Sequence, residues 1–395
     1  MRRAILHIGT EKTGTSTLQL FFAKNRAALA RNGILYPQFA GDVQHSRLTA
    51  YAQDDRIRDD LRIDLGIESA DDLAAFRTRV EAEAAAELGT APATLLFSSE
   101  HLQSRLVRES ELARLRAFLS AHVDRVEIAV YLRRQDLVAV SLYSTLVKFG
   151  GDREAIFPDL SKWRSYFDYA ALLERWAAAF GRDAIRPRIF EPACLRGGSV
   201  VEDFATEWAL GPGLRSVANA NESVAPAAQE WLRRLNSAYP GYLKGKRNPM
   251  RGRLGDHIGA LYPGKGLRPA RAEAAAFLAE FDEINDRVRR DWFPDRAGLF
   301  DPDLSGYPEA GDRRSFTFED AVEISVALWA ETRRRELQLE YEVALRDGEI
   351  AELKGETDIA RSAYARAAEL IPARPEAPAR LAQIEGHGRL GRLFR

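Results

Sequence analysis

Short apolar runs alternate with longer helical patterns over the first half of the chain. The runs with strand character are residues 4–8, 94–97, 126–132 and 185–190. The helical patterns between them are residues 15–32, 109–120 and 168–180. In the last of these, apolar side chains recur at i, i+3, i+4, i+7 and i+11, and Gly181 follows as a stop. Such alternation predicts an α/β fold, a parallel sheet with helices on both faces.

The pattern changes twice further along the chain. Residues 212–270 are less regular and carry six prolines and many basic residues, and a long helix with one apolar stripe over 277–288 follows them. Residues 301–317 are polar and rich in turn formers, which indicates a domain boundary. We therefore expect one domain over residues 1–305.

Beyond the boundary the pattern is helical, with one long helix expected over residues 318–347. The segment LKGETDIARSAYARAAELIP that follows resembles the second half of a tetratricopeptide repeat, with Gly355 at the turn between its helices. A plain helical hairpin is the alternative. One unit cannot bury its own apolar face. We therefore expect the extension, residues 318–395, to pack on the preceding helix, on the main domain, or on another chain, whether a protein partner or a second copy.

Composition narrows the class of protein. The chain has 395 residues with a net charge of −1, so no basic excess indicates a nucleic-acid partner. The single cysteine excludes a disulfide framework. No apolar stretch approaches the ~20 residues of a membrane span, and the N-terminus does not read as a signal peptide. We expect a soluble, cytoplasmic protein.

Residues 7–17, HIGTEKTGTST, form the loop between the first strand and the first helix. Backbone N–H groups at a helix start stabilise an anion. Gly14 allows close backbone approach, the hydroxyls of the next residues add donors, and Lys12 adds a cation. A nucleotide-hydrolysing P-loop has its lysine directly after the second glycine, whereas here Lys12 precedes that glycine. A donor with one phosphate at the loop and no metal requirement therefore fits better than magnesium–ATP.

The segment EKTGTST resembles the 5′-phosphosulfate loop of the PAPS-dependent sulfotransferases (PAPS is 3′-phosphoadenosine 5′-phosphosulfate). The resemblance implies a P-loop-like α/β fold. It also implies that Lys12 contacts the oxygen between phosphate and sulfate. The residues that it places on the donor phosphate are Lys12, Thr13, Gly14, Thr15, Ser16 and Thr17. Glu11 stands where the family has proline, which we treat as a minor departure because glutamate can occupy a loop entrance.

A second motif supports the same family. The run 126–132 ends at Arg133, and Ser141 follows eight residues later on the next helix. This spacing resembles the family's site for the 3′-phosphate, where arginine forks onto phosphate oxygens. The basic segment Gly264-Lys265-Gly266 resembles the late loop that often completes this site, so Lys265 is a further candidate.

Sulfuryl transfer also needs a base for the acceptor proton. The family commonly carries it after the second strand, where this chain reads SSEHLQS and offers both Glu100 and His101. Neighbouring side chains usually point apart, so we expect only one of them to face the sulfur. We favour Glu100, because bacterial and polysaccharide-type members of the family tend toward glutamate there, with His101 as the alternative. His45, in a polar loop beyond the first helix, is a third candidate for the catalytic site.

These observations predict an enzyme, a sulfotransferase that moves a sulfuryl group from PAPS to a hydroxyl acceptor, most simply a carbohydrate or glycan. Adenosine 3′,5′-bisphosphate is then the second product, and no metal is required. Two alternatives stay open. One is a kinase-like phosphotransferase on a P-loop scaffold, and the other is an interaction module whose α/β domain is catalytically inert.

Overall fold

The computed structural model describes residues 1–89, 92–217, 223–312 and 316–393. A five-stranded parallel sheet lies at its centre, in the order β2-β3-β1-β4-β5. Its strands are β1 (Arg3–His7), β2 (Ile34–Leu35), β3 (Thr94–Ser98), β4 (Arg125–Leu132) and β5 (Ile185–Ile189). The predicted fold class is confirmed: helices flank a parallel sheet and further helices follow at the C-terminal end.

The helices of the first 300 residues mostly follow the strands along the chain. They are α1 (Thr15–Lys24), α2 (Arg26–Arg31), α3 (Ser46–Ala52), α4 (Asp60–Asp64), α5 (Ala70–Leu88), α6 (His101–Arg105), α7 (Glu109–Ser120), α8 (Gln135–Lys148), α9 (Leu160–Phe167), α10 (Tyr169–Phe180), α11 (Val200–Glu207), α12 (Pro226–Ala238), α13 (Leu254–Leu261), α14 (Arg271–Ala279) and α15 (Asp282–Trp292). Short strands β6 (Ser223–Val224) and β9 (Pro263–Gly264) pair with each other, as do β7 (Tyr242–Leu243) and β8 (Lys246–Arg247).

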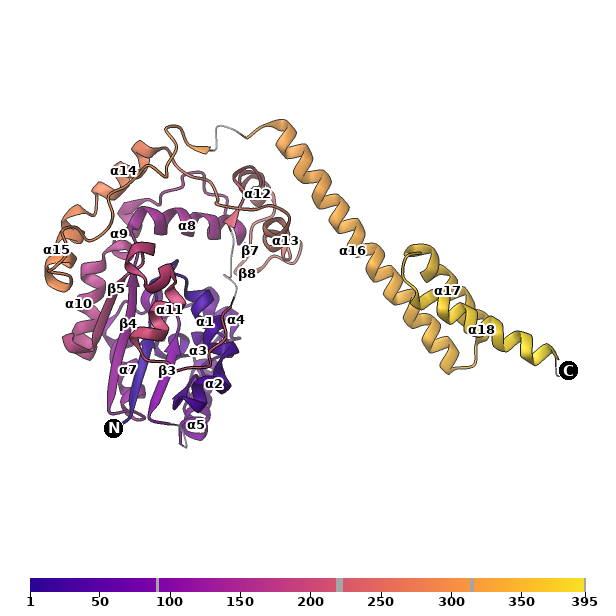
Figure 1. Cartoon of the computed structure of the whole chain (residues 1–395), viewed down its shortest axis with the longest axis horizontal. Coiled ribbons are helices and arrows are strands. Elements are labelled where there is room, and N and C mark those ends of the chain that lie inside the picture. The colour runs from indigo at the N-terminus through magenta and orange to yellow at the C-terminus, as the bar shows by residue number, and fades with distance from the viewer. Residues whose placement is uncertain (90–91, 218–222, 313–315, 394–395) are drawn as a thin grey trace. The chain divides into compact units, whose positions relative to one another are not determined.

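Alternate side chains of each strand enter two separate apolar layers, because successive residues of a strand point to opposite faces. Leu6, Phe97 and Val130 pack on one face with residues of α3, α5, α7 and α10. Ile5 and Leu96 pack on the other face with α1, α2 and α11. Figure 1 shows α8 crossing beyond the carboxyl ends of the strands. Loops at that edge of a parallel sheet are where such folds place ligands.

Three predicted helices differ from the observed ones. The helix expected over 15–32 is broken at Asn25, whose amide donates to the carbonyls of Phe21 and Arg215 and so ends α1. The late apolar stripe belongs to two helices, α14 and α15, with buried Phe281 at the turn between them. The helix expected to end at residue 347 continues to Leu353. The irregular segment 212–270 contains α12 and α13.

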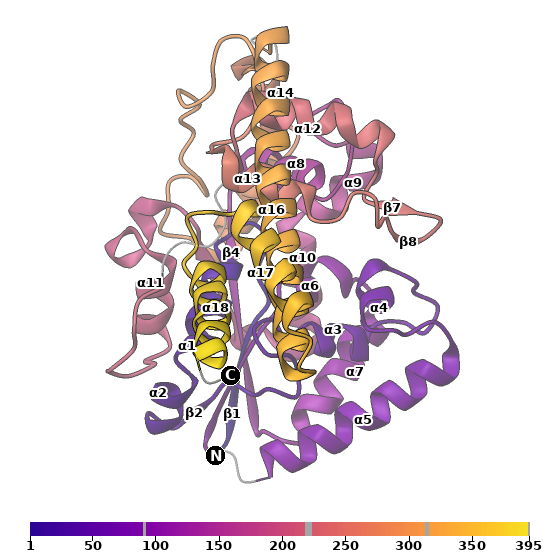
Figure 2. The same ribbon diagram turned by 90° about the vertical axis from the view of Figure 1, so that its right-hand side faces the viewer.

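The chain divides into two compact units, Met1–Phe316 and Thr317–Arg395. The second consists of α16 (Phe318–Leu353), α17 (Thr357–Leu370) and α18 (Glu376–Leu393). Gly355 makes the turn before α17 with φ +76°, and Tyr364 packs against Gly348 of α16, where a Cβ would lie 2.4 Å from the ring. Figure 2 shows α17 alongside α16. The tetratricopeptide assignment, the 1–305 and 318–395 domain limits, and association through these helices stay predictions.

None of the helices in the described residues combines the length and the apolar composition needed to cross a bilayer.

Candidate functional site

The loop after β1 is anchored to the neighbouring strand β4. The backbone N–H and the side-chain hydroxyl of Thr10 both donate to the carbonyl of Tyr131 at 3.0 Å, and the Tyr131 N–H donates to Gly9 at 2.7 Å. Gly14 then begins α1 with φ +77°. A Cβ on Gly14 would lie 2.9 Å from Val200. Any larger residue would therefore clash with Val200 and would also be strained by the positive φ.

The start of α1 has the features of an anion site. Leu18 N–H donates to the Gly14 carbonyl, so the first N–H groups of α1, those of Thr15 and Ser16, have no acceptor within the helix. No acidic residue occupies the first turn, and the helix dipole is positive at this end. The predicted phosphate residues from Thr13 to Thr17 therefore lie at one helix start, where backbone donors suit an anion.

Lys12 connects this loop to α8. Its backbone is in the left-handed region with φ +67°, which is uncommon for a residue other than glycine. Its Nζ donates to Thr145 Oγ1 of α8 at 2.7 Å, and its carbonyl accepts from Arg133 Nη1 at 2.8 Å. Burial lowers the pKa of Lys12, and the negative charges of Glu11 and Glu100 partly offset that effect. The ammonium is thus held in an enclosed position beside the start of α1.

The second predicted motif lies against the first. Arg133 follows β4, donates to Lys12, and lies over the Phe190 ring at 5.6 Å from its centroid. Thr145 Oγ1, which accepts from Lys12, also donates to the Ser141 carbonyl at 3.2 Å, so Ser141 and Thr145 share one face of α8. Lys12, Arg133 and that helix face therefore meet although 121 residues separate the first two.

Lys265 lies in an exposed loop beside the same helix. Gly266 is close to Ser144 of α8, where a Cβ would be 3.7 Å from the serine Oγ, and the Leu267 N–H donates to Gln229 at 2.7 Å. Ser144 is three residues from Ser141 along α8, so this loop runs past the helix that carries Ser141. Phosphate binding by Lys265 stays a prediction.

Glu100 and His101 begin α6 beside the loop. Glu100 Oε2 accepts from Gln19 Nε2 of α1 at 2.6 Å, and a Cβ on Gly9 would lie 3.2 Å from the Glu100 Cβ. Burial lowers the pKa of His101, and its Nδ1 is buried without a hydrogen-bond partner. The charge of Glu100 acts on Lys12. Glu100 therefore lies near enough to Lys12 to act on its charge, and the choice between the two bases stays a prediction.

His45 is fully buried, and its expected catalytic role stays a prediction. Its side chain is 0% exposed and stacks on Tyr36, with 4.2 Å between ring centroids. Its Nδ1 accepts from the Ser98 N–H at 3.2 Å, and burial lowers its pKa to about 3. The polar loop suggested exposure, but the ring fills an aromatic layer under the loop.

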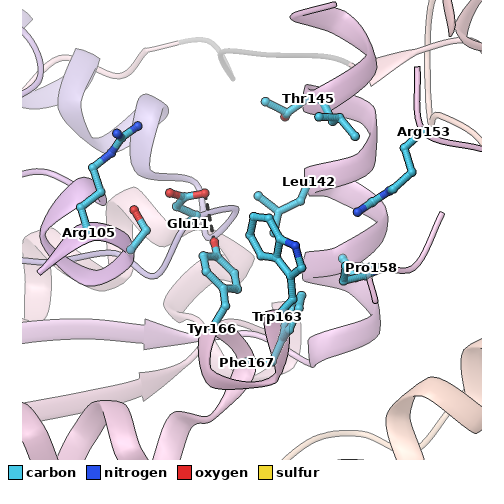
Figure 3. Close-up of a pocket in the computed structure, with 12 residues that line it drawn as sticks. Glu11, Arg105, Leu142, Thr145, Arg153, Pro158, Trp163, Tyr166 and Phe167 are labelled. Atoms are coloured by element: carbon cyan, nitrogen blue, oxygen red, sulfur yellow. Dashed lines mark hydrogen bonds between the residues drawn. The ribbon is translucent and has the colours of Figure 1, made fainter. Parts of the chain in front are cut away.

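A cavity of about 350 Å³ opens beside Lys12. Its lining is Glu11, Ser104, Arg105, Ala139, Leu142, Thr145, Leu146, Arg153, Pro158, Trp163, Tyr166 and Phe167. Glu11 Oε2 accepts from Tyr166 OH at 3.0 Å, as Figure 3 shows. Glu11 was not among the candidates expected from the sequence, although a carboxylate in place of the family's proline, directly before Lys12, was a signal that could have drawn attention to it.

Comparisons with known proteins add little beyond the geometry. No protein-family model matches the chain. An uncharacterized protein of Archaeoglobus fulgidus is 34% identical over 132 residues, which are 32% of this chain and 34% of that protein, so the match spans about a third of the relative's length. A solved sulfotransferase from Alicyclobacillus acidocaldarius aligns over 60% of this chain and 91% of its own, with 18% identity and a TM-score of 0.35. A likeness at that score carries no argument about function.

Proposed function

We propose that the protein is a sulfotransferase that moves a sulfuryl group from PAPS to a hydroxyl acceptor. The observation that carries the proposal is the junction of the two phosphate motifs. Lys12 accepts a hydrogen bond from Arg133 through its carbonyl and donates one to Thr145 through its ammonium. This contact supports the proposal, because a loop for a 5′-phosphosulfate and an arginine for a 3′-phosphate would have to lie together in one donor site.

The residues of the site suit such a donor. The N–H groups of Thr15 and Ser16 at the start of α1 and the nearby hydroxyls would hold the 5′-phosphate, and Arg133 with the Ser141 face of α8 would hold the 3′-phosphate. PAPS supplies an activated sulfuryl group. The acceptor oxygen forms a bond to sulfur while the bond from sulfur to the phosphate oxygen breaks, and its electron pair stays on that oxygen. The Lys12 ammonium stabilises the charge that develops there.

The acceptor proton must leave for a base close to the reacting oxygen. Two carboxylates act electrostatically on Lys12, those of Glu11 and Glu100. Glu11 is the one that lines the cavity beside the lysine. We therefore add Glu11 to the predicted pair of Glu100 and His101, and we propose that the cavity receives the acceptor. The cavity is lined by Trp163, Tyr166 and Phe167, and aromatic side chains of this kind are compatible with the ring of the expected sugar acceptor.

Transfer of radiolabelled sulfate from PAPS to pooled sugars, glycans and phenols tests the proposal. The wild-type protein should label at least one acceptor without added metal, and Lys12→Ala should remove most of that label while keeping its fold, because Lys12 lies in a loop. Equal labelling by the variant would contradict the role of Lys12. Phosphate transfer from magnesium–ATP with no sulfate transfer would favour the kinase-like alternative.

A further inference from the structure

The cavity beside Lys12 has an aromatic and aliphatic wall. Trp163, Tyr166 and Phe167 come from α9, and Leu142 and Leu146 come from α8. Trp163 is 46% exposed, which places an aromatic face at the accessible side of the cavity. Flat apolar surfaces of this kind bind the faces of rings. A volume of about 350 Å³ is at the small end of ligand pockets, so it suits one or two rings.

Two arginines line the cavity, and they differ in the groups to which they donate hydrogen bonds. Arg105 donates to the carboxylates of Asp59 and Asp60 at 2.6 and 2.8 Å, so acidic groups of the protein already neutralise it. Among the described residues, Arg153 donates only to the backbone carbonyls of Ala155 and Ile156, at 2.9 and 3.0 Å. Within the residues that the structure describes, no carboxylate forms an ion pair with Arg153.

Figure 3 shows the Arg153 guanidinium directed toward the cavity, on the side opposite Arg105. Its Nη1 makes no hydrogen bond among the described residues. Burial lowers the pKa of Arg153 because the charge is partly removed from water, and the guanidinium lies over the Tyr143 ring at 5.8 Å from its centroid. A half-buried cation without an anion is costly, and an anionic ligand in the cavity would relieve that cost through charge-assisted hydrogen bonds.

We propose that the acceptor is a ring compound that carries a hydroxyl group and a carboxylate, whose ring lies on the Trp163 wall and whose carboxylate binds Arg153. Its hydroxyl then reaches the opposite end, where Glu11 and Thr145 adjoin Lys12. The statement that this compound receives the sulfuryl group rests on the proposed function. Its binding in the cavity does not. Two sources have this chemistry, a uronic-acid sugar and a phenolic acid.

Calorimetry with matched pairs of probes tests the inference on the full chain. One pair is 4-hydroxyphenylacetate and its neutral amide, and the other is methyl glucuronoside and methyl glucoside. In one of the pairs the carboxylate should bind about tenfold to a hundredfold more tightly than its neutral partner. This ratio corresponds to the usual contribution of one hydrogen bond to a charged group. The pair that binds identifies the source.

Three variants locate the effect. Arg153→Gln should reduce the preference for the carboxylate to about twofold or less, and Trp163→Ala should weaken both members of the pair alike. Arg164→Gln is the matched control, because Arg164 lies on the same helix as Trp163, outside the lining, and pairs with Glu280. It should keep the full preference.

Equal binding of charged and neutral probes, binding of neither pair, or a preference that survives Arg153→Gln would overturn the inference. The readout does not involve the sulfuryl donor. Adenosine 3′,5′-bisphosphate is titrated separately into the same preparation. Carboxylate preference without binding of the bisphosphate would therefore sink the proposed function and leave the assignment of the cavity intact.

Discussion

Lys12 is a largely enclosed cation that donates to a hydroxyl and lies near two carboxylates. Its ammonium donates to Thr145, and the carboxylates of Glu11 and Glu100 lie near enough to act on its charge. In the proposed reaction, this enclosure would hold the ammonium ready to stabilise the leaving oxygen without the reorganisation that bulk water requires. It also has a cost, since burial favours the uncharged amine.

The pH dependence of kcat/KM should show the lowered pKa of Lys12. Burial lowers the pKa of Lys12 from its ordinary value of 10.5, so the ammonium loses its proton, and activity falls, at a lower pH than for an exposed lysine. Lys12→Arg should move this alkaline limb out of the measurable range, because guanidinium stays protonated. A limb at the same pH in Lys12→Arg would show that another group titrates.

Comparison of three variants separates the candidate bases. Replacing the true base should lower kcat by about 10²–10⁴-fold, the usual contribution of general base catalysis. Glu11→Gln, Glu100→Gln and His101→Ala are measured with the same acceptor, together with donor affinity. We expect the largest loss in kcat from one of the two carboxylate variants, with donor affinity nearly unchanged. If His101→Ala alone lost activity, both carboxylates would be excluded.

At the scale of elements, the junction of β4 and α8 brings the site together. β4 ends beside the loop, so Arg133 meets the Lys12 carbonyl, and α8 returns across the sheet with Ser141 and Thr145 on one face. The apolar runs and the spacing of Arg133 and Ser141 made this junction predictable. Thr145 was not, because no motif marks a helix hydroxyl whose partner lies 133 residues away.

Thr145→Val tests the junction. The variant keeps the shape of the side chain but leaves the Lys12 ammonium without its oxygen partner, so turnover should fall about tenfold. Thr145→Ser restores the hydroxyl and should recover most of the activity. Wild-type turnover in Thr145→Val would mean that α8 does not orient Lys12.

Sequence patterns predicted the longer elements better than the breaks between them. Strands β1, β3, β4 and β5 lie within a residue or so of their apolar runs, because burial on both faces leaves a continuous signal. The two-residue strand β2 and the break at Asn25 depend on contacts distant in sequence, such as the bond from Asn25 to Arg215. The position of His45 depends in the same way on the aromatic rings that surround it.

For the whole molecule, the division into two compact units predicts that the site is independent of the C-terminal helices. Every residue assigned to the loop, the 3′-phosphate motif and the cavity lies within Met1–Phe316. A protein ending at residue 316 should therefore unfold cooperatively and keep its affinity for donor and acceptor. If the shortened protein kept its fold but lost donor binding, the C-terminal helices would contribute to the site.

The most direct measurement is a calorimetric titration of adenosine 3′,5′-bisphosphate into the full chain in the presence of a metal chelator. We predict binding that Lys12→Ala and Arg133→Ala each weaken, because the two residues belong to the same site. The loss for Arg133→Ala should be about tenfold or more, as for a hydrogen bond to a charged group. No binding of the bisphosphate, together with tight binding of magnesium–ATP, would contradict the account.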